Sequence, residues 1–429
     1  MRDSQSINEA TEAELDRQAE AERQSEDESE EDESRDDDPA CKRLSRLLFP
    51  PAFSERTGVS VEGWLNQGFT WNPTNPADRF NGPLCHNDRA NEYQLNQLYV
   101  LCERPADSVG DELSFGFRGD LIYGTDAFLF QSLGLDDRTV PDHDSRFYKL
   151  AFPQLYVEGF VPVGPGVKIQ IGKFFTLVGY EYGLATEDFF YSHTLAYNGI
   201  AFALTGILLT VDLTDQVSTS HGVHRGSDVW EDNNNELGYL GYVSWTSHDE
   251  RTTVYGAVQF APEQDERADW QSLSGEPGPD APGRSLNRTN CSATLEHQVT
   301  EKLQYVFNHD YFFQSGAPEY GFYDAQAYAF TQYLYYDVSD RVRAGLRVEI
   351  LRDETGFLVS GFRSSNPAAP GLYTNLTLGL NIRQGKCILW RPEIRWDWQD
   401  RDDPSDAPAF NAGRASHQSL FALDMVVRF

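Results

Sequence analysis

The feature that most constrains this chain is a series of segments in which apolar and polar side chains alternate. The clearest segment, 341–352, reads RVRAGLRVEILR and places its aliphatic residues on one face and its arginines and glutamate on the other. Segments 113–122 and 387–398 alternate in the same way, and the chain ends on a further one, FALDMVVRF. A period of two is typical of a β-strand, and roughly ten residues are enough for a tilted strand to cross a bilayer.

These segments recur along the whole chain after its first 60 residues. We expect strands near 60–72, 93–105, 111–123, 148–161, 166–175, 199–213, 216–225, 237–247, 251–261, 286–299, 302–313, 322–337, 341–352, 372–383, 386–398 and 417–429. Short connections such as SHDE, TEK and RQGK alternate with long ones near 73–92, 124–147, 176–198, 226–236, 262–285, 353–371 and 399–416. An even strand number with short turns at one end and long loops at the other is typical of an outer-membrane barrel. The pattern therefore predicts an all-β fold, a transmembrane antiparallel β-barrel of about 16 strands.

The composition fits this prediction. Mean hydropathy is -0.53, and no run of 18 apolar residues would form a transmembrane helix. A barrel whose faces alternate between lipid and water has such an average. Trp71, Trp245, Trp396 and Trp398 fall near strand ends, where aromatic residues mark the lipid–water boundary.

The acidity of the chain is concentrated at its start. Residues 1–40 hold 17 Asp and Glu against 4 Arg, a charge of -13, which leaves -19 of the total -32 for the body. Such a segment cannot bury an apolar core, so we expect residues 1–55 to form a mostly disordered acidic tail and residues 56–429 to form the barrel. The opening residues MRDSQSINEA lack the features of a secretory signal peptide. If the protein is exported, we expect that the start of the sequence is placed too late or that it follows a signal peptide already removed.

The five cysteines are an odd number without a C-x-x-C spacing. We therefore expect no disulfide framework and no zinc site, and interpret Cys41, Cys85, Cys102, Cys291 and Cys387 as structural or incidental.

About half of the chain resembles a known family. The stretches that carry the resemblance include GWLNQGFTWNPTNPADRFNGP at 63–83, NEYQLNQLYVLCERPAD at 91–107, PQLYVEGFVPVGPGVKIQIGKFFTLVGYE at 153–181 and WEDNNNELGYLGYVSWTS at 230–247. They are similar, in the same order, to the beta-barrel porin-2 (OmpL-like) family of bacterial outer-membrane porins. The resemblance implies a porin and brings no catalytic residues. The long acidic tail departs from the family pattern.

The third long loop, 176–198, is the first candidate site. In many sixteen-stranded porins the third loop folds into the lumen, and this one is similar in position. Its residues would then form a pore constriction made of Tyr180, Glu181, Tyr182, Glu187, Asp188 and His193. The alternative is an external loop that packs on its neighbours.

The charged faces of the strands supply a second candidate set, the pore wall. It comprises Arg118, Asp120, Arg343, Arg347, Glu349, Arg383, Arg391, Glu393, Arg395, Asp397, Asp424 and Arg428. Charges are tolerated in a wet lumen, and charged rings there govern ion selectivity. The same mixture of signs could equally form an ion-paired lattice that only stiffens the wall.

The function that these patterns favour is a porin, a water-filled channel for passive diffusion of ions and small hydrophilic solutes, with a mild cation preference. The alternatives are a closed-lumen barrel acting as an enzyme or ligand-binding protein, and a soluble all-β surface protein. No serine, histidine and acid are placed by motif, so no enzyme is expected. The oxygen-rich run DVWEDNNNE at 228–236 lacks EF-hand spacing, so no metal or other cofactor is expected.

The expected location is the bacterial outer membrane. The partners implied are membrane lipid, small hydrophilic solutes and ions, and the barrel-assembly machinery, for which the terminal Phe429 resembles a recognition signal. A homotrimer is compatible with this class of barrel, although the sequence leaves the oligomeric state open. A charge of -32 argues against nucleic acid.

Overall fold

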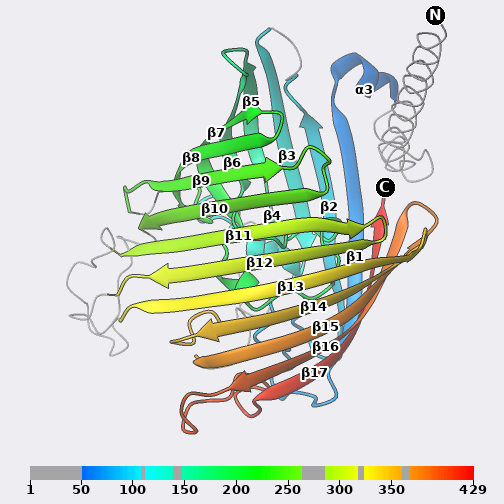
Figure 1. The fold of residues 1–429 in the computed structure, drawn as a ribbon, viewed down its shortest axis with the longest axis vertical. Coiled ribbons are helices and arrows are strands. Elements are labelled where there is room, and N and C mark those ends of the chain that lie inside the picture. Colours follow the sequence, from blue (N-terminus) through cyan, green and yellow to red (C-terminus); the bar gives the residue numbers. More distant parts are fainter. Residues whose placement is uncertain are drawn as a thin grey trace, which may run out of the picture.

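The computed structural model describes residues 51–107, 112–138, 147–232, 234–262, 286–316, 323–359 and 368–429. A short helix, α3 (Pro51–Thr57), precedes a single antiparallel sheet that curves into a barrel (Figure 1). The strands are β1 (Ser60–Trp71), β2 (Tyr93–Arg104), β3 (Ser114–Gly124), β4 (Lys149–Ala151), β5 (Leu155–Val161), β6 (Val167–Phe175), β7 (Ala203–Thr214), β8 (Val217–Ser227), β9 (Gly238–Thr246), β10 (Thr252–Pro262), β11 (Asn287–Thr300), β12 (Leu303–Gln314), β13 (Ala325–Ser339), β14 (Val342–Asp353), β15 (Gly371–Gln384), β16 (Ile388–Asp400) and β17 (His417–Arg428).

The wall has sixteen positions because β4 and β5 occupy one of them. Both strands pair with β3, β4 beside residues 122–124 and β5 beside residues 114–119. Pro153 lies in the gap between them and has no N–H to continue the ladder. The sixteen predicted strands are thus confirmed, with this break as the one feature that the alternation did not show.

The barrel closes between its first and last strands. β1 pairs with β17 from Trp64 opposite Arg428 to Trp71 opposite Phe421. Phe429 completes the seam through two backbone hydrogen bonds with Gly63, of 2.8 and 3.1 Å. Helix α3 and the C-terminus lie at the same end of the barrel (Figure 1).

The apolar faces of the strands point outward, as a lipid solvent requires. On β13, Tyr333 is 2% exposed and faces inward, whereas Tyr336 is 48% exposed and faces outward. The same alternation makes Phe330 and Leu334 outward-facing. Trp71, Trp245 and Trp398 are also exposed, while Trp396 is half-buried. A barrel in a membrane buries its polar lumen and exposes this apolar band.

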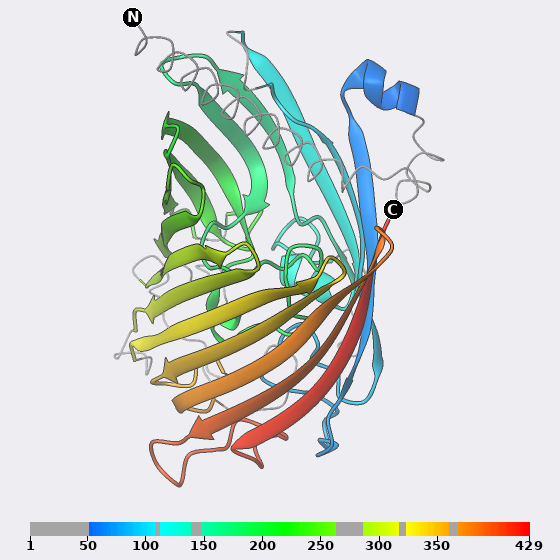
Figure 2. The ribbon, with the colours of Figure 1, turned by 45° about the vertical axis from the view of Figure 1, so that its right-hand side comes forward.

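Loops fill part of the barrel interior (Figure 2). We refer to residues 72–92 as loop 1, to the described residues 125–138 and 147–148 as loop 2, and to residues 176–202 as loop 3. Two 3-10 helices belong to them, η1 (Asp126–Phe130) in loop 2 and η2 (Ala196–Gly199) in loop 3. One apolar cluster joins the three loops to the wall, and its members include Leu84, Cys85, Tyr99, Ile122, Leu129, Phe130 and Leu195. The loops therefore pack on one another inside the barrel.

Within the described ranges, the helices are all too short and polar to span a membrane. The predicted tail of residues 1–55 lies almost wholly outside these ranges, and α3 crosses its expected boundary.

One cysteine departs from expectation. Cys387, in the turn between β15 and β16, is disulfide-bonded, so of the two interpretations the structural one applies to it. Cys85, Cys102 and Cys291 carry free thiols. Cys41 lies outside the described residues.

Deleting Phe429 is expected to lower the amount of assembled barrel several-fold. The deletion removes both hydrogen bonds to Gly63, each of about 1 kcal/mol, together with the ring that covers this glycine. Heat-modifiable mobility of the outer-membrane fraction measures the assembled form. Phe429→Tyr keeps the bonds and the ring and should assemble normally. Parental levels of the deletion variant would contradict the proposed role of this residue in closure.

Candidate functional site: loop 3 and the lumen wall

Loop 3 crosses the lumen and is held by the far side of the wall. It begins after β6, and its main partners β14 and β16 lie roughly half a turn away in the closed strand order. The carboxylate of Glu393 accepts the backbone N–H groups of residues 191–192 at 3.0 and 3.1 Å. Glu349 accepts those of residues 195–196 at 2.9 and 2.8 Å. Buried N–H groups that no strand satisfies are thus satisfied by wall carboxylates.

Wall arginines likewise donate hydrogen bonds to backbone carbonyl groups of loop 3. Arg391 donates to two of them at 3.0 and 2.7 Å. Arg347 donates to the carbonyl of Ser192 at 2.6 Å, and Arg395 donates to that of His193. Loop 3 is therefore held through its backbone. Wall carboxylates bind its N–H groups, and wall arginines bind its carbonyl groups.

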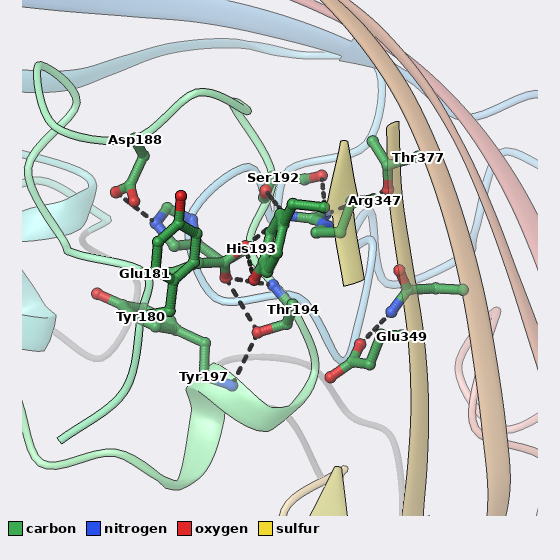
Figure 3. Close-up of polar contacts among 12 residues, drawn as sticks. Tyr180, Glu181, Asp188, Ser192, His193, Thr194, Tyr197, Arg347, Glu349 and Thr377 are labelled. Carbon is green, nitrogen blue, oxygen red and sulfur yellow. Dashed lines mark hydrogen bonds and ion pairs between the residues drawn. The ribbon is translucent and has the colours of Figure 1, made fainter. Parts of the chain in front are cut away.

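An ion pair ties a loop side chain to the same wall (Figure 3). Glu181 lies 2.7 Å from the guanidinium of Arg347, whose side chain is fully buried. The other oxygen of Glu181 accepts the amide and hydroxyl of Thr194 at 2.7 and 3.0 Å. Burial raises the pKa of Glu181, but the charges of Arg347 and His193 and the hydrogen bonds from Thr194 together outweigh burial, and the net pKa lies below the ordinary value of 4.5.

Loop 3 is expected to loosen in acid. Because the pKa of Glu181 is lowered where the loop is docked, its contribution to docking is present above pH 4.5 and is lost as the pH falls through the docked-state pKa. Single-channel conductance recorded at pH 7 and at about pH 3.5 should report this change. Glu181→Gln cannot titrate and should respond less. An equal acid response in both proteins would exclude Glu181 as its source.

A second charged cluster joins the three loops. His193 lies 3.1 Å from Asp188, and its ring stacks on that of His86 at 3.9 Å. His86 in turn lies 3.1 Å from Asp126 in η1. Burial lowers the pKa of His193, but the carboxylates of Asp188 and Glu181 and the backbone hydrogen bond to Tyr182 together outweigh burial, and the net pKa is raised. Burial, followed by the neighbouring His193, lowers the pKa of His86. The cluster thus fixes loop 1, loop 2 and loop 3 to one another.

Three consecutive aromatic residues of loop 3, Phe-Phe-Tyr at 189–191, rest on glycines of the wall. A Cβ atom at Gly345 would lie 2.2 Å from the first ring, and one at Gly68 would lie 2.7 Å from the third. At Gly379 the distance to the second ring would be 3.0 Å. These glycines supply the space that the loop's aromatic side chains occupy.

Between loop 3 and the short-turn end of the barrel lies a cavity of about 1390 Å³. All six loop residues of the predicted constriction line it, namely Tyr180, Glu181, Tyr182, Glu187, Asp188 and His193. Of the three carboxylates, Glu181 and Asp188 are held in the ion pairs above, and Glu187 is exposed.

The twelve predicted wall residues divide into two groups. Arg343, Arg383 and Arg428 line the cavity. The other nine form paired or hydrogen-bonded sets away from it: Arg118, Asp120, Arg347, Glu349, Arg391, Glu393, Arg395, Asp397 and Asp424. Arg118 and Asp120 stand apart from loop 3, beside Tyr99. Ion pairs join Arg118 to Asp120, Arg391 to Asp424 and Arg395 to Asp397. The residues that hold loop 3 are Arg347, Glu349, Arg391, Glu393 and Arg395.

Several residues of this site were not predicted. His86 and Asp126 lie in loops without a motif, and Gln97 on β2 binds the backbone of loop 3 at 2.8 Å. The only signal was the polar face of β2, where Gln94 and Asn96 alternate with apolar residues. In the part of the chain that the structure describes, no three His, Cys, Asp or Glu residues are grouped as metal ligands would be.

Comparison with known proteins assigns this barrel to a family. The family described as "Putative beta-barrel porin-2, OmpL-like" matches residues 58–429. The chain belongs to this family. It is an outer-membrane porin, and its β-barrel spans that membrane. No curated protein matches the chain.

Solved structures share the fold of the porin. OmpT, an outer membrane protein of Vibrio cholerae, aligns with a TM-score of 0.54 and 13% identity over 86% of this chain and 97% of its own. The channel DcaP of Acinetobacter baumannii aligns with a TM-score of 0.54 and 9% identity, over 86% of this chain and 97% of its own. An anion-selective porin from Comamonas acidovorans aligns with a TM-score of 0.54 and 9% identity, over 86% of this chain and 99% of its own.

Proposed function

We propose that this porin admits ions and small hydrophilic solutes passively, along a path narrowed by loop 3. The observation that carries the proposal is the fastening of loop 3 across the lumen, above a water-accessible cavity of about 1390 Å³. The contacts are to the loop backbone, so they fix its course while leaving part of its side chains to face the solute.

Solute entry into proteoliposomes tests this function. Liposomes that contain the porin should swell in small sugars, at rates that fall steeply as the solute grows. Liposomes with heat-denatured porin are the control. Swelling rates equal to that control would overturn the proposal.

We propose a mild cation preference. Its support is the body charge of -19, which remains after residues 1–40 are set aside, and the exposed Glu187 on loop 3. A narrow pore focuses fixed charge and concentrates counter-ions. Pairing of Glu181 with Arg347 and of Asp188 with His193 keeps the preference small.

Replacing Glu187 with glutamine is expected to reduce the cation preference. The reversal potential in a salt gradient measures it, and the difference from the parent should vanish near 1 M salt, where screening acts within about 3 Å. Glu301→Gln is the matched control, because Glu301 is exposed in the β11–β12 turn and does not line the cavity. Equal shifts in the two variants would show that loop 3 does not set selectivity.

One observation favours a second candidate, a barrel with a closed lumen that binds a ligand. The apolar cluster of loops 1–3 packs inside the barrel and reaches the wall at Tyr99 and Ile122. The absence of stable open steps in planar bilayers would select this candidate. We propose no catalytic role for the chain.

We also propose a homotrimer. The support is the fold shared with porins, among them a form of Vibrio cholerae OmpT described as a trimer, at 12% identity and a TM-score of 0.54. Sedimentation in detergent measures the mass directly, and a monomeric mass would overturn the assignment.

A further inference from the structure

Three tyrosines and one glutamate line the same side of the cavity beneath loop 3. Tyr242, Tyr255 and Glu296 come from the neighbouring strands β9, β10 and β11, and Tyr182 comes from loop 3. In the register of the sheet, Tyr255 is the diagonal neighbour of both Tyr242 and Glu296, a spacing that aromatic side chains can bridge. The rings of Tyr242 and Tyr255 lie 6.0 Å apart at 41°. We call these four residues the aromatic–acid cluster.

Glu296 has no cationic partner among the described residues. Its polar neighbours are the side-chain amide of Gln304, which donates to it at 3.3 Å, and the hydroxyl of Tyr255. Glu181, in contrast, is paired with Arg347. Glu296 is half-buried and lines the cavity, so its charge acts on ions in the lumen. A carboxylate in this position favours a cationic ligand.

The cationic side chains of the cavity lining belong to other strands and do not neutralise this cluster. They come from β14, β15, β17 and the turns beside them, namely Arg341, Arg343, Arg383, Lys386 and Arg428. Arg343 pairs with Asp337 at 3.5 Å, and two of the others, Lys386 and Arg428, also have interaction partners. Two unpaired arginines of the lining therefore remain. The lining carboxylates without a cation are three, Glu187, Glu296 and Asp340.

We propose that the aromatic–acid cluster binds small molecules that carry a trimethylammonium group as they pass through the pore. The methyl groups would rest on the faces of the tyrosine rings, which attract a cation through the ring quadrupole. The carboxylate of Glu296 would supply the counter-charge. A trimethylammonium group has no N–H to donate, so it suits a site made of ring faces better than a primary ammonium does. The inference rests on the proposed channel and gives its cation preference a chemical basis.

Inhibition of the K⁺ current in planar bilayers, at about 0.1 M salt, tests this site. The probe is choline. Its matched comparison is the neutral carbon analogue dimethylbutanol, in which a tert-butyl group replaces trimethylammonium. In the parent, choline should halve the current at about tenfold lower concentration than the analogue, the factor that a cation–π contact in a partly desolvated site supplies. Ethanolamine, which has the charge without the methyl groups, should fall between the two.

The carboxylate is tested by Glu296→Gln, which keeps the size of the side chain and removes its charge. Choline should then inhibit several-fold less, while inhibition by dimethylbutanol should stay unchanged. Glu301→Gln is the matched control, because Glu301 is exposed in the β11–β12 turn and does not line the cavity. It should leave inhibition by choline at the parental level.

The rings are tested separately from their hydroxyl groups. Tyr242→Leu with Tyr255→Leu removes two ring faces and should weaken inhibition by choline several-fold. Tyr242→Phe with Tyr255→Phe keeps the faces and should inhibit like the parent, as should the lipid-facing Tyr336→Leu. Heat-modifiable mobility shows which variants assemble. If the double leucine variant does not, Tyr182→Leu changes a side chain that is 54% exposed on loop 3 and should also weaken inhibition.

The outcomes separate the site from the channel. Equal inhibition of the parent by choline and by dimethylbutanol, or unchanged inhibition by choline in Glu296→Gln, overturns the site and leaves the channel intact. Saturation-transfer NMR of choline with the detergent-purified porin measures binding without conductance. Binding that Glu296→Gln weakens, in a porin that gives no open steps, would support the site and overturn the channel.

Discussion

Replacing Arg347 with alanine is expected to release loop 3 from β14, raise single-channel conductance and destabilise the barrel. The substitution leaves the Glu181 carboxylate buried without its cation and the carbonyl of Ser192 without its donor. Removing one partner of a buried ion pair costs about 3–5 kcal/mol, more than the loss of an exposed pair. Conductance in planar bilayers and thermal unfolding followed by heat-modifiable mobility measure the two effects.

Two further variants isolate the ion pair as the cause. Arg347→Met combined with Glu181→Gln removes both charges, so it should retain more stability than Arg347→Ala. Arg341→Ala removes an exposed arginine from the turn before β14 and should leave stability unchanged. If Arg347→Ala keeps the parental conductance and stability, the pair does not hold loop 3.

Replacing Gly345 with valine is expected to push loop 3 off the wall by a different route. The added side chain would occupy the position of the Phe189 ring, since even a Cβ would lie 2.2 Å from it. Overpacking of this kind costs about 1–3 kcal/mol. We expect larger conductance and a lower unfolding temperature. The rings of Phe190 and Tyr335 lie 4.8 Å from that of Phe189 and restrict its movement.

Gly119→Val is the matched control for the glycine. Gly119 also lies in a barrel strand, but the nearest heavy atom to its Cβ position is 3.8 Å away, in the side chain of Leu155. It should therefore be tolerated. Equal conductance in the parent and in Gly345→Val would mean that the aromatic residues of loop 3 do not need this space.

The strands could be predicted from the sequence because their signal is local. Alternation at a period of two reports which side chains meet lipid, whatever the strand's neighbours are. The break between β4 and β5 was missed because it depends on a single residue, Pro153, within an otherwise regular segment. The Cys387 disulfide was missed because spacing alone does not identify a partner.

The candidate site was only partly predictable because its contacts are distant in the chain. The position of loop 3 followed from the resemblance, but its anchoring joins Glu181 to Arg347 and Tyr191 to Glu393. No periodicity relates such residues. Nor did the sequence distinguish exposed charges that line the cavity, such as Glu187, from those that hold a loop. That difference is set by packing across the lumen.

Single-channel recording in planar bilayers, with a salt gradient across the membrane, tests the central claim most directly. A water-filled channel narrowed by loop 3 predicts stable open steps, a reversal potential of the sign for mild cation preference, and a larger step in Arg347→Ala. A correctly assembled barrel that gives no open steps, in the parent and in this variant alike, would contradict the claim.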